Sequence, residues 1–194
     1  MKLQNVIILG LLLKCCVCFS QSLKHPLQIL IDPGHGGIDS GAVGKNGVLE
    51  KDLVLQIAKQ LTRNASSFDH NPAHYYLTRY ADTLISLGDR TDLAKQLKAD
   101  LFISLHFNDA PDTNAQGIEV YVYDGPSRYR KESVWLAYTI QEKLAGLTKQ
   151  NKRGVKFGDF QVLRDLSYRC PAVLVELGFI DHHQQYPKNN KLPQ

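Results

Sequence analysis

The chain has 194 residues, of which 43% are hydrophobic and 22% are charged. This length and composition fit one domain with a well-buried core, and they exclude a disordered or fibrous protein. The formal net charge is +4, too small an excess to indicate a nucleic-acid partner. A local basic cluster could meet an anionic wall or membrane surface, although a solvated loop is the simpler explanation: Lys149, Lys152, Arg153 and Lys156.

The first twenty residues differ from the rest of the chain. Lys2 precedes an almost unbroken apolar run from Val6 to Leu13, and the segment ends at the small residue Ser20. We interpret residues 1–20 as a secretory signal peptide, because the apolar run is short for a membrane span and Ser20 suits cleavage. An uncleaved membrane anchor is the alternative, and Lys14 argues against it by cutting the run short.

Removal of this leader would change both charge and thiol content. Loss of Lys2 and Lys14, with no acid lost, lowers the formal net charge from +4 to +2. Three of the four cysteines lie in the leader, so the mature chain would keep Cys170 alone and form no internal disulfide. We therefore expect an exported protein, with no stable membrane span after signal removal, that relies on its core or on a metal.

A short linker of residues 21–26 then leads to a hydrophobic strand, Leu27 to Ile31. The strand ends in a loop rich in glycine and proline, residues 33–47. A helix opens at Glu50, because the apolar positions that follow repeat at helical spacing: Leu53, Val54, Ile57, Ala58 and Leu61.

The middle of the chain continues the alternation of strands and helices. After a polar loop from Asn64 to Pro72, a strand is predicted over His74 to Thr78. The next helix is expected to present one apolar face with Leu87, Ala94 and Leu97. The run from Leu101 to His106 alternates too little for an exposed strand and suits a sheet buried on both faces.

The last third contains the longest predicted helix, over Ser127 to Leu147. It follows a strand over Gly117 to Tyr123, which alternates better and is therefore expected nearer a sheet edge. We predict a loop from Thr148 to Gly158 and a short strand or extended loop over Phe160 to Leu163. Ala172 to Glu176 form the last core strand.

Strands that alternate with helices in this way predict an α/β fold. We expect a mostly parallel central sheet of about six strands with helices on both faces. One domain would cover residues 27–181, followed by a polar C-terminal tail over residues 182–194, and we find no internal repeat.

Polar residues at the predicted strand ends indicate the chemistry. In a parallel sheet the carboxyl ends meet at one edge, so His35, His106 and Glu176 can converge, and Glu50 can join them from its helix. Two imidazoles and a carboxylate are a common catalytic zinc set. A second carboxylate beside the metal could act as general base.

Each residue also has a structural explanation. From position alone, Glu50 is better explained as an acid that stabilises the first turn of its helix. A histidine after a strand is more often hydrogen-bonded than metal-bound, and no HExxH or CxxC signature is present. Spacing alone therefore leaves the metal hypothesis open.

Five blocks of sequence occur in an order that is specific to one family. The blocks are Asp32-Pro33-Gly34-His35-Gly36-Gly37 with Asp39, Ser40 and Gly41, then Glu50-Lys51-Asp52, Thr78-Arg79, Ala99 to Asn108 and Pro171 to Ile180. Over nearly the whole mature chain they closely resemble the zinc-dependent N-acetylmuramoyl-L-alanine amidases of the AmiA/AmiB/AmiC-like type 3 group.

The resemblance implies one Zn²⁺ ion and a role for each site residue. It implies that Glu176 is the catalytic glutamate, and that Asn108 and Arg79 are supporting groups that orient the substrate or the ligands. The implied ligands are His35, Glu50 and His106. The implied reaction is hydrolysis of the amide between N-acetylmuramic acid and L-alanine in peptidoglycan. Separately, we expect a monomer, and because no wall-binding module accompanies the domain we favour the periplasm, with the cell wall or the outside of the cell as alternatives.

The sequence departs from the family pattern in two ways. Regulated members carry a helical insertion that occludes the zinc, whereas Tyr123 here leads through Asp124-Gly125-Pro126 directly into the long helix. We therefore predict an open site that requires no activator. The closing helix usual after the glutamate block is also missing from the pattern. Two rivals remain, a non-catalytic wall-binding module and a different zinc hydrolase, such as a peptidase or deacetylase.

Overall fold

The computed structural model describes residues 25–45, 47–65, 73–112 and 114–181. These residues form six strands and four helices. In chain order they are β1 (Leu27–Pro33), α2 (Glu50–Ala65), β2 (Ala73–Leu77), α3 (Leu87–Gln96), β3 (Leu101–Asn108), β4 (Ile118–Tyr123), α4 (Arg130–Thr148), β5 (Lys152–Gly158), α5 (Gln161–Arg164) and β6 (Ala172–Phe179).

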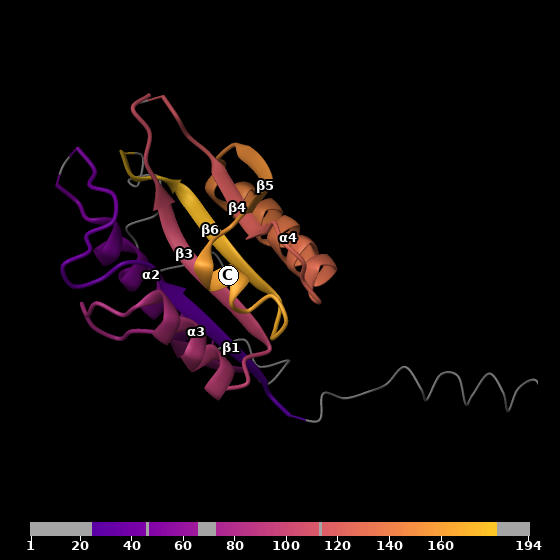
Figure 1. The fold of residues 1–194 in the computed structure, drawn as a ribbon. Helices are drawn as coiled ribbons and strands as arrows, with labels where there is room; N and C mark the ends of the chain where they lie inside the picture. Colours follow the sequence, from indigo (N-terminus) through magenta and orange to yellow (C-terminus); the bar gives the residue numbers. More distant parts are fainter. Residues whose placement is uncertain (1–24, 46, 66–72, 113, 182–194) are drawn as a thin grey trace, which may run out of the picture.

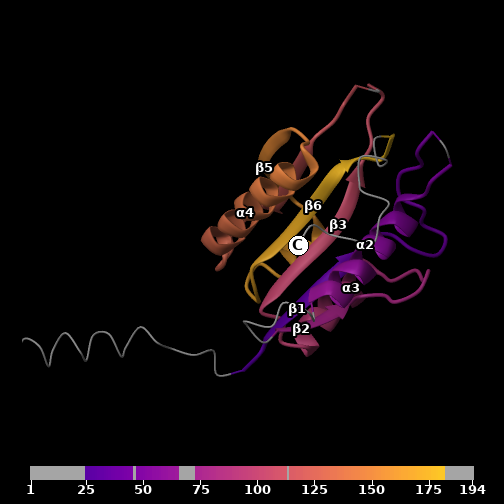
Figure 2. The ribbon, with the colours of Figure 1, turned by 180° about the vertical axis from the view of Figure 1, so that it is seen from behind.

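The strands make one sheet in the order β2-β1-β3-β6-β4-β5. The first four strands of this order run parallel to one another, β4 is antiparallel to β6, and β5 is parallel to β4. Figure 1 shows β5 and α4 toward one edge of the sheet and α2 and α3 toward the edge that carries β1; the view from behind adds β2 beside β1 (Figure 2). The predicted α/β fold with a mostly parallel sheet is confirmed.

Helices cover both faces because successive strand residues point to opposite sides. On one face, Val54 and Ala58 of α2 and Ala137 of α4 pack in a buried cluster with residues such as Val173 of β6. On the other face, Ala94 of α3 joins a second cluster that includes residues of α5 and β6. The sheet therefore has two separate cores, and the carboxyl ends of β1, β3 and β6 lie between them at one edge.

Two predicted segments were wrong. The predicted loop from Thr148 to Gly158 contains the strand β5, which pairs only with β4 and so forms an edge. Its lysines and glycines conceal the alternation, as is usual for an edge strand. The segment Phe160 to Leu163, predicted as a strand or extended loop, contains the start of the one-turn helix α5. A short apolar run cannot distinguish a helix from a strand.

The predicted helix faces also needed correction at their ends. Leu87 and Leu147 are exposed, whereas Arg90 is buried at 3% exposure within α3. The buried face of α3 is thus partly polar, since Arg90 serves the site loop described below. Gly117 to Tyr123 was expected nearer an edge, and β4 does lie directly beside the edge strand β5; only its antiparallel direction was not anticipated.

The connection between β4 and α4 consists of residues 124–129. The predicted direct passage from strand to helix is therefore confirmed, and no additional helix interrupts this stretch. The signal peptide of residues 1–20 and the tail of residues 182–194 lie outside the described residues. Within the part of the chain that the structure describes, no helix is long and apolar enough to cross a membrane.

Candidate metal centre and active site

The loop after β1 is held from below by two buried arginines. Arg79 donates from Nε to the Pro33 carbonyl at 3.0 Å and from Nη2 to the Gly34 carbonyl at 2.8 Å. Arg90 donates to the carbonyls of Pro33 and His35 at 2.9 and 2.8 Å. These bonds satisfy three consecutive carbonyl groups that would otherwise be costly to bury.

Arg90 is itself fixed by Asp32, the last polar residue of the β1 core. Its Nη1 lies 2.6 Å from Asp32 Oδ1, and both side chains are almost completely buried. Thr78 and Ser104 donate hydroxyl hydrogen bonds to the two Asp32 oxygens at 2.6 and 2.7 Å. The aspartate thus ties together β1, β2, α3 and β3 directly beneath the loop.

His35 adopts a left-handed backbone conformation, with φ of 58°, which is uncommon for a residue other than glycine. Its Nδ1 lies 2.9 Å from Asp39 Oδ2, while Nε2 faces Glu50 Oε1 at 3.2 Å. A carboxylate on one ring nitrogen fixes the tautomer that leaves the other nitrogen available as a ligand. The hydrogen bond with Glu50 raises the pKa of His35 against the opposing effect of burial.

Glu50 enters the site from the first turn of α2 and is 3% exposed. Its Oε1 accepts from the Phe107 amide at 3.0 Å, and its Oε2 accepts from the Ala42 amide at 2.8 Å. Burial alone would raise the pKa of Glu50, but hydrogen bonds from His106 and His35 hold it well below its ordinary value. The carboxylate is therefore ionised, as a metal ligand must be.

His106 lies near the end of β3, and its Nδ1 is 2.9 Å from Glu50 Oε1. The ring passes directly over Gly34, where an added Cβ would overlap it. Position 34 therefore requires glycine, because the His106 ring packs against its Cα with no room for a side chain. The two imidazoles meet edge to face, with ring centroids 4.9 Å apart.

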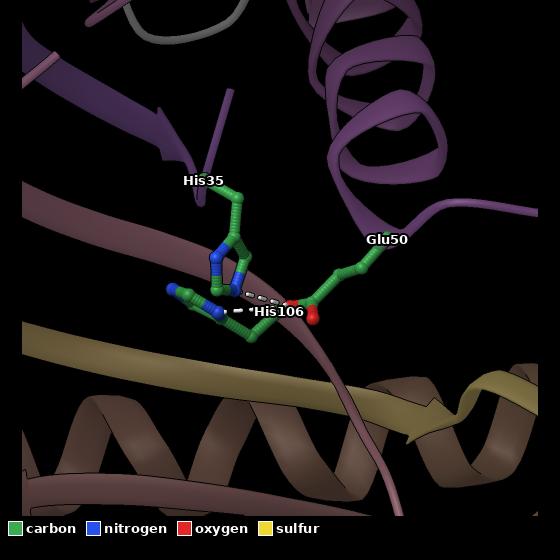
Figure 3. Close-up of side chains that lie close together, drawn as sticks. All are labelled: His35, Glu50 and His106. Atoms are coloured by element: carbon green, nitrogen blue, oxygen red, sulfur yellow. Dashed lines mark hydrogen bonds and ion pairs between the residues drawn. The ribbon is translucent and has the colours of Figure 1, made fainter. Parts of the chain in front are cut away.

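The structure brings together the three residues expected to bind the metal. One ligand atom from each of His35, Glu50 and His106 lies within 4.8 Å of the others. Figure 3 shows the loop, the helix and the strand delivering them to one point, with both rings turned toward the carboxylate. Two imidazole nitrogens and one carboxylate oxygen are a donor set that suits zinc.

Glu176 lies beside this cluster, on β6 and in register with His106 of β3. Its Oε2 is buried and has no hydrogen-bond partner among the described residues. Burial, aided by the charges of Glu50 and Glu119, raises the pKa of Glu176 to about 7, although the histidines oppose the rise. A buried carboxylate oxygen without a partner is unusual and points to a functional role.

Sequence reasoning missed Glu119, which is 4% exposed and pairs in register with Glu176 across β4 and β6. Because β4 is antiparallel to β6, the beginning of β4, and not its end, lies at the site. The available signal was an acidic residue between the apolar positions Ile118 and Val120. Asp39 was part of the first sequence block, but its contact with His35 was not anticipated.

Of the two supporting residues, Asn108 reaches the site and Arg79 lies beneath it. Asn108 donates from Nδ2 to Glu119 Oε1 at 2.8 Å. Arg79 is 3% exposed, and each of its hydrogen bonds goes to a backbone carbonyl, including that of Lys51. Its contacts are those of a residue that orients the ligand loop.

The Arg90 contacts predict a large stability effect. Replacing Arg90 by Met should lower the free energy of unfolding by about 3–5 kcal/mol, because Asp32 would remain buried without its cation. Urea denaturation measures the change. Arg63→Met, at an exposed position of α2, is the matched control, and its free energy of unfolding should stay within about 0.5 kcal/mol of the parent. Equal midpoints for the two variants would contradict this account of the loop.

The close approach at Gly34 predicts that one methyl group disturbs the metal centre. Gly34→Ala should weaken zinc affinity about 10–100-fold, the range found when groups that orient ligands are lost. Competition with a chelating dye measures the affinity. Gly146→Ala adds the same methyl group in α4, where nothing lies within 4 Å, and should leave the affinity unchanged. A native-like Gly34→Ala variant with unchanged affinity would refute the prediction.

The raised pKa of Glu176 predicts a pH dependence in the metal-free protein. Between its ordinary pKa and about 7 the folded state holds a proton that the unfolded state has released, so its contribution to stability falls as pH rises through this range. From pH 5 to pH 8 the wild type should therefore lose stability relative to Glu176→Gln. Urea denaturation of both proteins at each pH tests this; a constant difference would rule it out.

Comparison with known proteins agrees with this site. Residues 29–191 match the family described as N-acetylmuramoyl-L-alanine amidase. The chain is 38% identical to N-acetylmuramoyl-L-alanine amidase LytC of Bacillus subtilis over 92% of this chain and 35% of that protein. It is 39% identical to a sporulation-specific N-acetylmuramoyl-L-alanine amidase of the same organism over 80% of this chain and 57% of that one.

The chain thus spans between about a third and somewhat over half of the length of these two curated relatives. Among solved structures, an N-acetylmuramoyl-L-alanine amidase from Clostridium difficile 630 superposes with a TM-score of 0.73 and 36% identity. The match covers 82% of this chain and 83% of that one. This chain belongs to the N-acetylmuramoyl-L-alanine amidase family.

Proposed function

We propose that this protein is a zinc-dependent N-acetylmuramoyl-L-alanine amidase. It would hydrolyse the amide between the lactyl group of N-acetylmuramic acid and the L-alanine of the peptide stem in peptidoglycan. One observation carries the proposal: His35, Glu50 and His106 converge beside the unpaired carboxylate of Glu176, in a chain of the amidase family.

His35, Glu50 and His106 would hold one Zn²⁺ ion. Their donor atoms are already gathered, and Asp39 holds His35 in the orientation that a ligand needs. When bound, a zinc ion supplies Lewis acidity, which polarises a carbonyl group and makes water more acidic.

Glu176 would act as the general base. The positive charge of a neighbouring cation favours its ionised form, so the oxygen that now lacks a partner can accept a proton from the attacking water. The same carboxyl group can then pass this proton to the nitrogen of the leaving amine, which departs as the free stem peptide. Burial of its Oε2 limits access of bulk water to this oxygen.

We further propose that residues 27–181 form the catalytic domain and that residues 1–20 act as a signal peptide. Export, with the periplasm as the favoured compartment, would bring the enzyme to peptidoglycan as a monomer. The short connection of residues 124–129 supports an open site that works without an activator protein.

The test is digestion of purified sacculi by residues 21–194 loaded with zinc. We expect free peptides that begin with L-alanine, together with intact glycan, in mass spectra of the products. A chelator should abolish release and added zinc should restore it. Glu176→Gln should lower the rate about 10²–10⁴-fold, the usual contribution of a general base, while still binding one zinc ion.

Other outcomes identify the rivals. Shortened peptides would indicate a peptidase, and released acetate would indicate a deacetylase. Binding to sacculi without any product would indicate a non-catalytic wall-binding module. Activity that appears only with an added partner protein would contradict the predicted open site.

A further inference from the structure

A row of residues crosses one face of the sheet beside the candidate base. His106 of β3, Glu176 of β6, Glu119 of β4 and Gly154 of β5 are successive partners in the strand registers. Directly paired residues on neighbouring strands point to the same face. The face that carries the proposed chemistry therefore continues through Glu119 to the edge strand.

Glu119 is fully engaged in hydrogen bonds. Its Oε1 accepts from Asn108 Nδ2 at 2.8 Å and from the Tyr121 hydroxyl at 2.9 Å, and its Oε2 accepts from Arg153 Nε at 2.9 Å. Burial and the bond to Glu119 raise the pKa of Tyr121 to about 12, so this hydroxyl keeps its proton. Glu119 consequently has little capacity for proton transfer, and its contacts are those of a residue that holds its neighbours in place.

Arg153 is held in two ways and remains accessible. The register of β5 shifts so that Arg153 is the extra residue of a β-bulge, a feature that redirects a side chain. Its guanidinium group lies over the Phe179 ring, 5.1 Å from the centroid, in addition to its bond with Glu119. The side chain is 39% exposed, and its terminal Nη1 and Nη2 have no partner among the described residues.

The space above Gly154, next to Arg153, is open. An added Cβ at Gly154 would meet no atom within 4 Å. Lys156 is exposed and lies on the same face, because it pairs in register with Tyr121. By contrast, Lys152 forms an ion pair with Glu142 of α4 at 2.8 Å. Arg153 and Lys156 therefore lie on the sheet face that carries the proposed site, and Arg153 is the one that reaches Glu119.

We infer that Arg153, fixed by Glu119 and Phe179, binds a carboxylate group on the second residue of the peptide stem. This inference rests on the proposed function and extends it to substrate recognition. A guanidinium whose terminal nitrogens both lack a partner in the described part of the chain is the group best matched to a carboxylate, which it can bind through two parallel hydrogen bonds.

The spacing suits this position in the substrate. Neighbouring strands are about 4.8 Å apart, and Glu119 pairs with Glu176 on the next strand. The Arg153 guanidinium, which bonds Glu119, therefore lies at about that spacing plus the length of a side chain from Glu176. One extended residue spans roughly 3.5 Å, which brings the second residue of the stem near Arg153 when the scissile nitrogen is at Glu176. The lactyl carboxyl group is consumed in the scissile amide, so the carboxylate must come from the peptide.

The experiment compares two synthetic muramoyl dipeptides with the zinc-loaded enzyme. They differ only in whether the second residue carries a free carboxylate or the corresponding carboxamide. For the wild type we expect kcat/KM to be roughly 10-fold or more higher for the carboxylate, in keeping with a charge-assisted hydrogen bond. Most of the difference should appear in KM.

Arg153→Gln should bring the ratio of the two kcat/KM values close to 1, whereas Arg153→Lys should retain part of the preference. Lys152→Gln, which removes the neighbouring charge on the other face, should keep the wild-type ratio. Because both substrates are measured on the same sample, the ratio is independent of the fraction of protein that is folded.

Three results would overturn the inference, and they can be told apart. A wild-type ratio near 1 would exclude a carboxylate subsite. Equal losses on both substrates in Arg153→Gln, with the ratio unchanged, would mean that Arg153 only balances the charge of Glu119. Cleavage of neither substrate by the wild type, with sacculi also intact, would overturn the proposed amidase function itself.

Discussion

The ion pair between Asp32 and Arg90 is the constraint on which the site depends. A buried ion pair contributes little net stability, since desolvation offsets its attraction, but it is costly to break and it fixes geometry. Here it places a guanidinium under the carbonyls of Pro33 and His35. With Arg79 beside it, the loop can hold His35 in a left-handed conformation that its backbone would otherwise seldom adopt. The orientation of the first candidate ligand therefore begins three residues before it.

The reversal of β4 is the second determinant of the site. In a wholly parallel sheet, the neighbour of Glu176 at this edge would be another strand end, followed by a loop. The antiparallel β4 instead begins here, so a regular strand residue, Glu119, stands in register with Glu176. Strand residues are more rigidly placed than loop residues, and this allows Glu119 to fix Asn108 and Arg153 at once.

The fold and the convergence of His35, Glu50 and His106 could be predicted from local patterns in the sequence, whereas their assignment as metal ligands came from the family resemblance. The run before His35, the helical spacing after Glu50 and the run before His106 all define elements by periodicity, and the rule for parallel sheets then brings their ends together. The strand β5 and the role of Arg90 could not be predicted in this way. Lys152 to Gly158 becomes a strand only through β4, and a charged residue in a helix is normally assigned to its solvent face.

Glu119 and Glu176 show how environment separates two identical side chains on adjacent strands. Three donors, Asn108, Tyr121 and Arg153, bond to Glu119 and fix its carboxylate in place. Its charge then adds to the burial that raises the pKa of Glu176. None of these three donors bonds Glu176, and one Glu176 oxygen, Oε2, lacks any partner in the described structure. Glu119, with its hydrogen bonds made, holds the surrounding groups in place. Glu176, with an oxygen that lacks a partner, can gain a favourable interaction by taking up a proton or lying beside a cation. This asymmetry arises from the strand register, and it assigns the chemistry to Glu176 rather than to Glu119.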